Sequence, residues 1–391
     1  MRRIASTPRA DIVQVADELG FPLLECDGKP YWDETAYYSF SLRQIEDDLE
    51  DPTAELHALI LDTVAHVVSD EATLRRLGFP AHSWNWIADS WRRRDLSLYG
   101  RMDLVYDGQT PAKLLEYNAD TPTALYEASV FQWRWMNDLK ASGALEASAD
   151  QFNSIHEKLL DWFGACGDRR DLHLAGYLDN MEDGLCIDYI AYCAGEAGLQ
   201  TQRLSLEDIG LMPDRLWRAG HFIDRSGRKI ERLFKLYPWE WMLADPFGQD
   251  SAISRLTCYE PLWKSIVSNK GFLALLWARE PGHPNLLPTY FEDDSAAAAL
   301  SGSYARKPLF SREGANVSLF RHGVLLEEAP GGYGTEGHVI QQLHLLPDFD
   351  GNFPIIGSWV IGDQPAGIGI REDDTRITRN TSRFVPHIFV D

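Results

Sequence analysis

The feature that most constrains the fold is a pair of short runs, residues 100–106 and 113–118, in which polar and apolar side chains alternate. Such alternation predicts two β-strands with one polar face each, because successive strand side chains point to opposite sides. The turn signal Asp107-Gly108 lies between the runs, but the connection is longer than a two-residue hairpin and leaves the turn type open. We therefore expect two neighbouring strands that can gather several polar side chains.

The polar faces of these strands carry oxygen ligands and one cation. Arg101 and Asp103 share a face of the first strand. Glu116 and Asn118 likewise share a face of the second. If the strands pair, three side-chain oxygens converge beside an arginine, which suits Mg²⁺ and a phosphoryl group in transfer. Spacing alone leaves a surface hairpin with scattered charges as the alternative.

The residues after the second strand predict a helix. Thr121-Pro122 is typical of a helix cap, with the helix beginning at Thr123. A helix N-terminus at this place would bind an anion, and the hydroxyls of Thr121 and Thr123 would donate to it. Plain capping is the other interpretation of both threonines.

The rest of the first half predicts helices, with an α/β unit in the middle of the chain. Asp51-Pro52 is typical of a helix start, and Gly198 is typical of a helix end. Apolar residues at helical spacing predict helices from Asp51 to Val67, from Gln151 to Cys166 and from Leu185 to Leu199, with a strand from Leu172 to Leu178 before the last helix.

From about residue 230 onward, the pattern becomes mixed and then rich in strands. A strand is expected at 231–237 and one long helix at 261–278. Turns bearing Gly and Asp separate five further predicted strands, at 304–310, 317–320, 323–327, 339–346 and 355–361. The fold class we expect is α+β, in a chain of 391 residues that is long enough for one multi-lobed unit or for two to three domains.

The charge balance narrows the choice of partner. The formal net charge is −22, which argues against nucleic acid and favours cationic substrates such as polyamines.

The five cysteines form no C-x-x-C pair, which argues against a disulfide framework or a zinc knuckle. The N-terminus leads into a polar stretch and no segment is long enough to span a bilayer, so we expect a cytoplasmic protein without a membrane partner.

A longer pattern resembles a known family. R-x-D followed by L-L-E-Y-N-A-D-T-P-T, within residues 101–123, resembles the synthetase domain of the glutathionylspermidine synthase family. The resemblance extends from about Asp33 to Phe384. The later matching pieces are E-P-L-W at 260–263, S-N-K at 268–270, Y-A-R-K-P at 304–308, Gly314, Asn316, Q-Q-L at 341–343 and G-I-R at 369–371.

This resemblance implies an ATP-grasp-like fold and an activity. It implies one synthetase unit over 1–391, with an approximate substrate and metal-hairpin lobe at 1–230 and a nucleotide-binding lobe at 231–391. The implied activity is that of a Mg²⁺-dependent, ATP-driven ligase, which joins a carboxylic acid to an amine through an acyl-phosphate. A peptide such as glutathione is the candidate acid, and a polyamine is the candidate amine.

The resemblance also implies roles for individual residues. Arg101 and Arg371 match catalytic arginines, and the matches to magnesium ligands are Asp103, Glu116 and Asn118. The residues that match ATP contacts are Arg101, Lys270, Lys307, Gly314, Gln341, Gln342, Leu343 and His344. The residues that match the substrate side are Thr121, Thr123, Glu182 and Asp183, of which the two threonines stand where full-length members carry Ser-x-Ser.

Bifunctional members of the family carry an N-terminal amidase whose catalytic cysteine has no match here, so the pattern indicates the stand-alone synthetase branch.

Two other functions stay open. One is an ATP-binding protein of the same fold without turnover, against which the complete set around Arg101 argues. The other is a carbohydrate-active hydrolase, which thirteen tryptophans and many carboxylates would suit. A requirement for ATP separates the ligase from the hydrolase.

Overall fold

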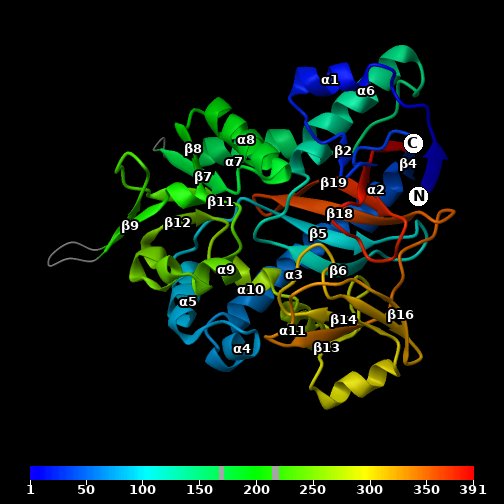
Figure 1. Ribbon diagram of the computed structural model, residues 1–391. Helices are drawn as coiled ribbons and strands as arrows, with labels where there is room; N and C mark the ends of the chain where they lie inside the picture. The colour runs from blue at the N-terminus through cyan, green and yellow to red at the C-terminus, as the bar shows by residue number, and fades with distance from the viewer. Residues whose placement is uncertain (167–170, 214–219) are drawn as a thin grey trace.

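The two alternating runs form adjacent strands of a five-stranded antiparallel sheet at the centre of the molecule (Figure 1). The computed structural model describes residues 1–166, 171–213 and 220–391. The strands of this central sheet, in the order β20-β19-β18-β5-β6, are Arg383–Val385 (β20), Gln364–Asp373 (β19), Phe353–Ile361 (β18), Tyr99–Val105 (β5) and Lys113–Asn118 (β6). The sheet thus joins the predicted hairpin to segments from the C-terminal end of the chain.

A second five-stranded antiparallel sheet lies below the central sheet in the view of Figure 1. Its strands, in the order β13-β17-β14-β15-β16, are Thr289–Phe291 (β13), His338–Gln342 (β17), Tyr304–Pro308 (β14), Ser318–Arg321 (β15) and Val324–Glu328 (β16). The strand-rich pattern predicted for the second half is confirmed, although the strand predicted at 339–346 ends at Gln342.

A four-stranded parallel sheet on the left of Figure 1 is the α/β unit predicted in mid-chain. Its strands, in the order β12-β11-β7-β8, are Thr257–Tyr259 (β12), Arg232–Lys235 (β11), Leu172–Gly176 (β7) and Thr201–Ser205 (β8). Helix α8 (Met181–Glu196) packs on β7 and β8 and begins earlier than predicted, because the side chain of Asn180 caps it. Its end lies where predicted, before Gly198 at φ 91°.

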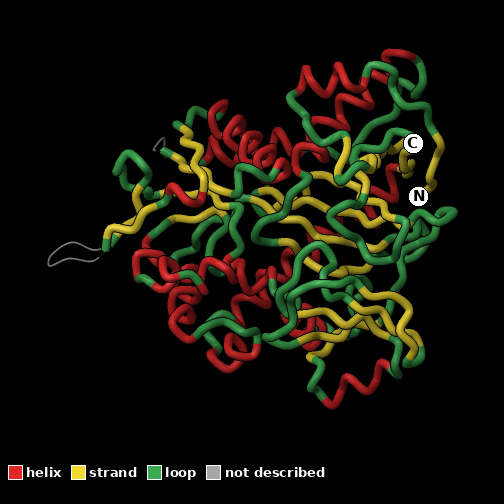
Figure 2. The backbone as a smooth tube through the Cα atoms, in the orientation of Figure 1, coloured by secondary structure: helices red, strands yellow, loops and turns green. Residues whose placement is uncertain are grey.

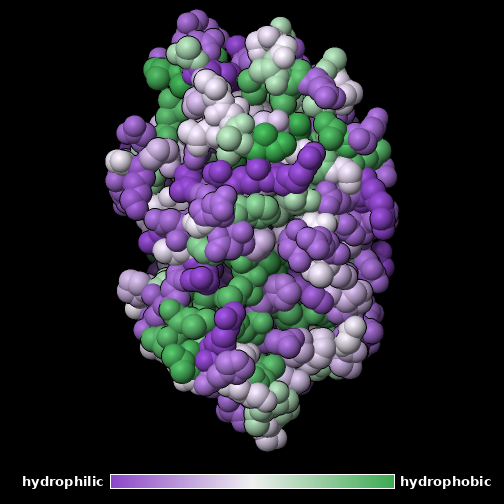
Figure 3. Space-filling model, turned by 90° about the vertical axis from the view of Figure 1, so that its right-hand side faces the viewer, coloured by the Kyte–Doolittle hydropathy of each residue, from purple (hydrophilic) through white to green (hydrophobic). Residues whose placement is uncertain are grey.

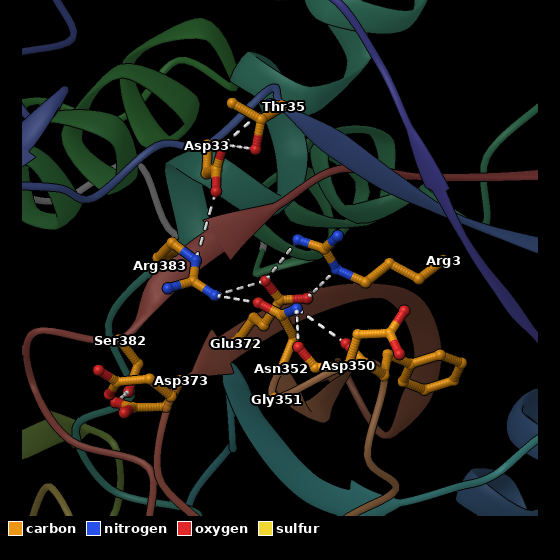
Figure 4. A network of polar contacts seen from close by, with 12 residues as sticks. Arg3, Asp33, Thr35, Asp350, Gly351, Asn352, Glu372, Asp373, Ser382 and Arg383 are labelled. Atoms are coloured by element: carbon orange, nitrogen blue, oxygen red, sulfur yellow. Dashed lines mark hydrogen bonds and ion pairs between the residues drawn. The ribbon is translucent and has the colours of Figure 1, made fainter.

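Both ends of the chain enter one three-stranded sheet, in which β4 (Ala36–Ser41) lies between β1 (Arg2–Ala5) and β21 (His387–Val390). Figure 4 shows how the N-terminal strand is tied to the central sheet through the buried carboxylate of Glu372. That carboxylate accepts hydrogen bonds from Arg3 Nε and from Arg383 Nη2, each at 2.7 Å. Two smaller sheets pair Glu25–Cys26 (β2) with Lys29–Pro30 (β3) and Gly210–Met212 (β9) with His221–Ile223 (β10).

Helices lie around the strands, as the tube in Figure 2 shows. The other α-helices are Ile12–Leu19 (α1), Leu42–Ile45 (α2), Asp51–Val67 (α3), Glu71–Arg76 (α4), Trp84–Arg92 (α5), Gln132–Ser142 (α6), Ile155–Ala165 (α7), Trp239–Ala244 (α9), Lys264–Ser268 (α10) and Gly271–Arg279 (α11). π-Helical turns occupy Glu46–Glu50 and Glu127–Phe131. Within the described ranges, no helix is both long and apolar enough to cross a membrane. The face drawn in Figure 3 is mainly hydrophilic and carries smaller hydrophobic patches.

Strand β5 is buried on both faces, and this places the polar residues of the hairpin inside the molecule. Met102 and Leu104 belong to an apolar cluster that extends to Leu56 on α3. Tyr99, on the opposite face, belongs to a second cluster that includes Trp359 and the packed surfaces of α7 and α8. Arg101 and Asp103 share the face of Tyr99, because side chains two positions apart point the same way.

The single helix predicted at 261–278 is wrong, because Asn269 divides it into α10 and α11. Asn269 has extended backbone, and its side chain both donates to the carbonyl of Leu77 and accepts from the N–H of Gly271, each at 2.8 Å. These tertiary contacts override the helical periodicity. The break turns the next residue, Lys270, toward the hairpin.

Helix α3 covers the predicted range Asp51–Val67, but its predicted cap is wrong, and so is the start of the helix predicted from Gln151. Asp51 is not a cap, because α2, a π-helical turn and α3 follow one another, and the cap of this assembly is Ser41 in a capping box with Gln44. The helix predicted from Gln151 begins at Ile155. The side-chain amide of Gln151 instead donates to two backbone carbonyls. The carbonyl oxygen of Gln132, one of the two, lies 3.0 Å from Gln151 Nε2.

Candidate active site

The hairpin brings the predicted metal ligands together. Its register sets Arg101 opposite Asn118 and Asp103 opposite Glu116. The amide nitrogen of Asn118 donates to Asp103 Oδ2 at 2.8 Å and to Glu116 Oε1 at 3.3 Å. The convergence that the strand alternation predicted is therefore confirmed.

Arg101 is held in a fixed orientation beside these oxygens. Its Nε and Nη2 donate to the two oxygens of Asp103 at 2.7 and 3.1 Å, and its Nη1 donates to the carbonyl of Thr123 at 2.9 Å. The guanidinium lies 5.7 Å from the ring centre of Trp359. Gly357 on β18 leaves the space, because a Cβ there would come within 2.6 Å of the Arg101 side chain.

Two lysines from different parts of the chain approach Glu116. Lys270 Nζ lies 2.9 Å from Glu116 Oε2 and donates to the carbonyl of Ser311 at 2.8 Å. Burial opposes ionisation of Glu116, but Lys270 and Lys307 lower the pKa of its carboxyl to about 2. Burial in turn lowers the pKa of Lys307 to about 8. Lys307 Nζ donates to Gln341 Oε1 at 2.7 Å and to the carbonyl of Leu115 at 2.8 Å.

These groups open into one cavity of about 320 Å³, which is lined by residues of both five-stranded sheets. The predicted site residues that line it are Arg101, Asp103, Glu116, Asn118, Thr121, Thr123, Glu182, Asp183, Lys307, Gly314, Gln341, Gln342, His344 and Arg371. Lys270 and Leu343 are predicted site residues that do not line it. The structure therefore gathers most of the predicted residues around one space, although they come from distant segments.

One end of the cavity is apolar. Ala305, Val317, Leu319 and Ile377 form a small buried cluster against which Leu345 packs, and all five line the cavity. Strand β17 passes beside them, and its residues pair on both sides with β13 and β14. The backbone of Gln341 and Gln342 is thus engaged in the sheet, and the N–H of Leu343 also donates to the carbonyl of Ser303, at 3.2 Å.

The two predicted substrate threonines also line the cavity, but the helix predicted from Thr123 begins two residues later. Helical structure begins at Leu125, and Ala124 has a φ of 65°, outside the helical region. The hydroxyl of Thr123 donates to Glu182 Oε2 at 3.2 Å. The hydroxyl of Thr121 accepts from Arg312 Nη1 at 2.6 Å. Both side chains serve the cavity wall, and neither caps a helix.

Many lining residues were not predicted, and several of these are aromatic or charged. Tyr177 and Trp241 line the cavity near Tyr237, with ring centres 6.0 Å apart for Tyr177–Tyr237 and 5.9 Å apart for Tyr237–Trp241. Arg312 lies over Trp241 and pairs with Glu240 at 3.1 Å. Arg312 lies two residues before Gly314, so the predicted ATP contact at Gly314 was the signal that could have identified it. The aromatic residues carry no local signal, because the fold of the chain brings them together.

The hairpin fits a hard divalent cation only with help from another ligand. Two carboxylates and one amide converge there, and the described residues contain no group of three or more His, Cys, Asp or Glu side chains that could hold a metal. The amide of Asn118 presents its nitrogen to both carboxylates, so a cation at this point would need the amide turned to present its oxygen. These oxygens suit Mg²⁺ when phosphate oxygens complete its shell.

Residues 3–390 match the family described as glutathionylspermidine synthase preATP-grasp. The chain belongs to this family. A Haemophilus influenzae protein, named provisionally as an acid–amine ligase, is 41% identical over 100% of both chains. A solved structure of a glutathione synthetase-like effector from Globodera pallida aligns with a TM-score of 0.56 at 11% identity over 98% of each chain, which shows the same fold.

Two longer relatives have more specific names. The trypanothione synthetase of Crithidia fasciculata is 27% identical over 84% of this chain and 53% of its own length. The bifunctional glutathionylspermidine synthetase/amidase of Escherichia coli is 26% identical over 96% of this chain and 62% of its own length. The chain therefore spans between about half and two thirds of each of these two relatives, and their substrates remain properties of those proteins.

Proposed function

We propose that this protein activates a carboxylic acid with ATP at the Arg101 end of the cavity and passes the acyl group to an amine. As a member of its family, the chain is an ATP-dependent ligase that forms carbon–nitrogen bonds. The observation that carries the proposal is the convergence of Arg101, Asp103, Glu116 and Lys307 in one cavity with an apolar slot at its end.

The apolar slot suits the adenine of ATP. A planar base would lie between Val317, Leu319 and Leu345, and the backbone beyond Gln342 would meet its polar edge. Lys307 lies between this slot and the hairpin, where an ammonium group would contact phosphate oxygens. Lys270 stands behind Glu116 and would reach the phosphates after releasing that carboxylate.

The chemistry proceeds in two displacements. A carboxylate oxygen of the acid attacks the γ-phosphorus of ATP, and the bond to ADP breaks to give an acyl-phosphate. The amine nitrogen then attacks the acyl carbon, loses a proton, and phosphate leaves as the amide forms. Arg101 and Arg371 stabilise the charge on the transferred phosphoryl group, which is the main contribution that a protein makes to such a transfer.

Magnesium would be held by Asp103, Glu116 and the turned amide of Asn118, and would supply positive charge next to the ATP phosphates. Because the hairpin offers two charged ligands, Mg²⁺ should bind weakly to the protein alone and much more tightly with ATP. The carboxylates are held by Arg101 and Lys270 when no metal is bound. Metal binding would require Arg101 and Lys270 to share or release these oxygens.

The amine would approach past the aromatic and acidic rim. Tyr177 and Trp241 offer ring faces to a cationic amine, and Glu182 and Asp183 offer carboxylates nearby. Burial raises the pKa of Asp183 to about 6, so the group is ionised at neutral pH. A cationic polyamine fits this rim and the acidic balance of the chain, whose net charge is −22.

The test is a screen of phosphate release from ATP with paired carboxylic acids and amines, including glutathione and spermidine, with and without Mg²⁺. We expect release that requires both substrates and the metal, together with an amide product identified by mass spectrometry. ATP binding without release under any pair would favour a nucleotide-binding protein instead. Product formation without ATP would contradict the proposal.

A further inference from the structure

Arg371 is held by the backbone of a loop, not by a carboxylate. The loop, residues 374–382, connects β19 to β20. Arg371 Nε donates to the carbonyl of Ser382 at 2.9 Å, and Nη2 donates to the carbonyls of Asn380 at 2.8 Å and Arg379 at 3.3 Å. We call these three oxygens the carbonyl clamp. They fix one edge of the guanidinium and leave Nη1 to face elsewhere.

The carbonyl clamp orients Arg371 without reducing its charge. Carbonyl oxygens are neutral acceptors, whereas a carboxylate partner would cancel the positive charge that a transferred phosphoryl group needs. Arg371 lines the cavity, and its guanidinium lies 5.2 Å from the ring centre of Tyr31. The position of this cation therefore depends on the shape of the loop.

The loop is shaped in turn by one buried carboxylate, Asp373, at the end of β19. Asp373 Oδ1 accepts from the N–H of Thr375 at 3.0 Å, from its hydroxyl at 2.9 Å and from Arg379 Nη2 at 2.6 Å. Its Oδ2 accepts from the hydroxyl of Ser382, the contact drawn in Figure 4. The same hydroxyl accepts from the N–H of Arg379 at 2.8 Å. Asp373 thus binds both ends of the loop.

The same loop also forms part of the cavity lining away from Arg371. Arg376, Ile377 and Thr378 line the cavity, and Thr378 lies against the loop that carries Gly314. A Cβ at Gly314 would come within 2.5 Å of the carbonyl of Thr378, so the two loops touch closely. A change in the shape of the 374–382 loop would move both Arg371 and this contact.

We propose that Asp373 is a positioning residue for phosphoryl transfer: it holds the carbonyl clamp in place and so aims Arg371 at the reacting group. The inference rests on the proposed function, because it assigns Arg371 to the transferred phosphoryl. Asp373 does not itself accept a hydrogen bond from Arg371, and acts through the loop. Ser382 is its partner, since the Ser382 hydroxyl and carbonyl contact Asp373 and Arg371 respectively.

The test is a double-mutant cycle with a matched control. Asp373→Asn should lower the rate of ATP-dependent phosphate release by about 10–100-fold, as a small misplacement of a catalytic group does, with the KM for ATP within about twofold of wild type. Ser382→Ala should show a weaker form of the same loss. Asp374→Asn is the control, because Asp374 is exposed and its ion pair with Arg379 contributes little.

The decisive arm is Asp373→Asn made in an Arg371→Ala background. If Asp373 acts through Arg371, adding Asp373→Asn to the Arg371→Ala variant should lower the rate of phosphate release by less than about twofold. The reason is that the two sites are coupled. A further loss equal to that of the single variant would overturn the inference. The inference would also be overturned if Asp373→Asn had wild-type activity. The same holds if Arg371→Ala kept the full rate of an active wild-type protein.

A structural readout separates this inference from the proposed function. Hydrogen exchange at the amides of Thr375 and Arg379 should accelerate in Asp373→Asn, while β18 and β5 remain protected. The substitution removes the charge and one of the two acceptor oxygens that hold Thr375, Arg379 and Ser382, and these contacts lie within the loop. Unchanged loop protection would overturn the inference even if the protein proves to be a ligase. Accelerated loop exchange in a protein that turns over no ATP would leave the loop assignment standing and reject the proposed function.

Discussion

The two arginines that we assign to the transferred phosphoryl group, Arg101 and Arg371, are held by opposite kinds of partner. Arg101 is bound through two hydrogen bonds by the carboxylate of Asp103, whereas Arg371 is bound by the neutral oxygens of the carbonyl clamp. Asp103 is also a proposed metal ligand, so Arg101 must share or release it when the metal binds. The partners of Arg371 are backbone carbonyls, so metal binding at the hairpin does not compete for them.

The difference shows how one site can be stable before its ligands arrive. The carboxylates of the hairpin would repel one another if they were unpaired. Each of them forms an ion pair with a cation instead: Asp103 with Arg101, and Glu116 with Lys270. Ligand binding can then exchange partners without exposing an uncompensated charge. The carbonyl clamp needs no such exchange, because the contacts of Arg371 within the described residues are hydrogen bonds to carbonyl oxygens and include no ion pair.

The largest effect is expected from Glu116→Ala. The change removes a charged metal ligand, so it should abolish ATP turnover while circular dichroism shows an intact fold, since the Glu116 side chain is 26% exposed and contributes little to the core. Glu116→Gln should be equally inactive. Lys113→Ala, on the same strand but outside the cavity lining, is the control and should keep full turnover. Normal Mg²⁺-dependent turnover in a folded Glu116→Ala protein would make the hairpin structural only.

Arg101→Ala sharpens the contrast between the arginines. It should cut the rate by about 10²–10⁴ and spare ATP binding, because the group acts mainly on the transition state. It should also tighten Mg²⁺ binding to the nucleotide-free protein, because Asp103 loses its competing cation. Arg371→Ala should change that Mg²⁺ affinity less, because Arg371 attracts Asp103 from a distance and forms no ion pair with it. Calorimetric titration of both variants measures this, and equal Mg²⁺ affinities would contradict the exchange of partners.

Lys307→Ala is expected to weaken ATP binding by about 1–3 kcal/mol, the scale of one charged hydrogen bond. Titration with a non-hydrolysable ATP analogue gives the affinity. Lys113→Ala again serves as the control, because it removes a lysine from the same region without touching the cavity. An unchanged affinity in Lys307→Ala would reject the assignment of this lysine to the phosphates.

The smallest effect is expected in the pH dependence of amine use. Asp183 has a pKa raised by burial to about 6, and only its ionised form attracts a cationic amine. The KM for the amine should therefore fall by a few fold as the pH rises from about 5 to about 7. Asp183→Asn should flatten this part of the profile. A profile that is the same in wild type and variant would remove Asp183 from the amine side.

The hairpin could be predicted from sequence because its information is local. Alternation over a few residues fixes which side chains share a face, and both strands are close in the chain, so Asp103 and Glu116 meet. The family membership and the ATP-grasp-type fold were also predicted correctly, from several motifs in a fixed order.

The misses arose where distant segments decide the local structure. Helix α10 ends just before Asn269, whose side chain donates to the carbonyl of Leu77. Ala124 has a φ outside the helical region, and the carbonyl of the preceding residue, Thr123, accepts from Arg101. The carbonyl clamp has no sequence signal either, since backbone oxygens are the same in every residue. Such features follow from tertiary contacts that propensity does not contain.

The order of the central sheet has a consequence for synthesis of the protein. Strand β5 pairs on one side with β6, which follows closely in the chain, and on the other with β18, which begins at Phe353. A nascent chain that has not reached β18 carries an open strand edge beside Arg101, and such edges pair readily with other chains. Because this long-range pairing also slows folding, we expect ribosome-bound and truncated forms to depend on chaperones.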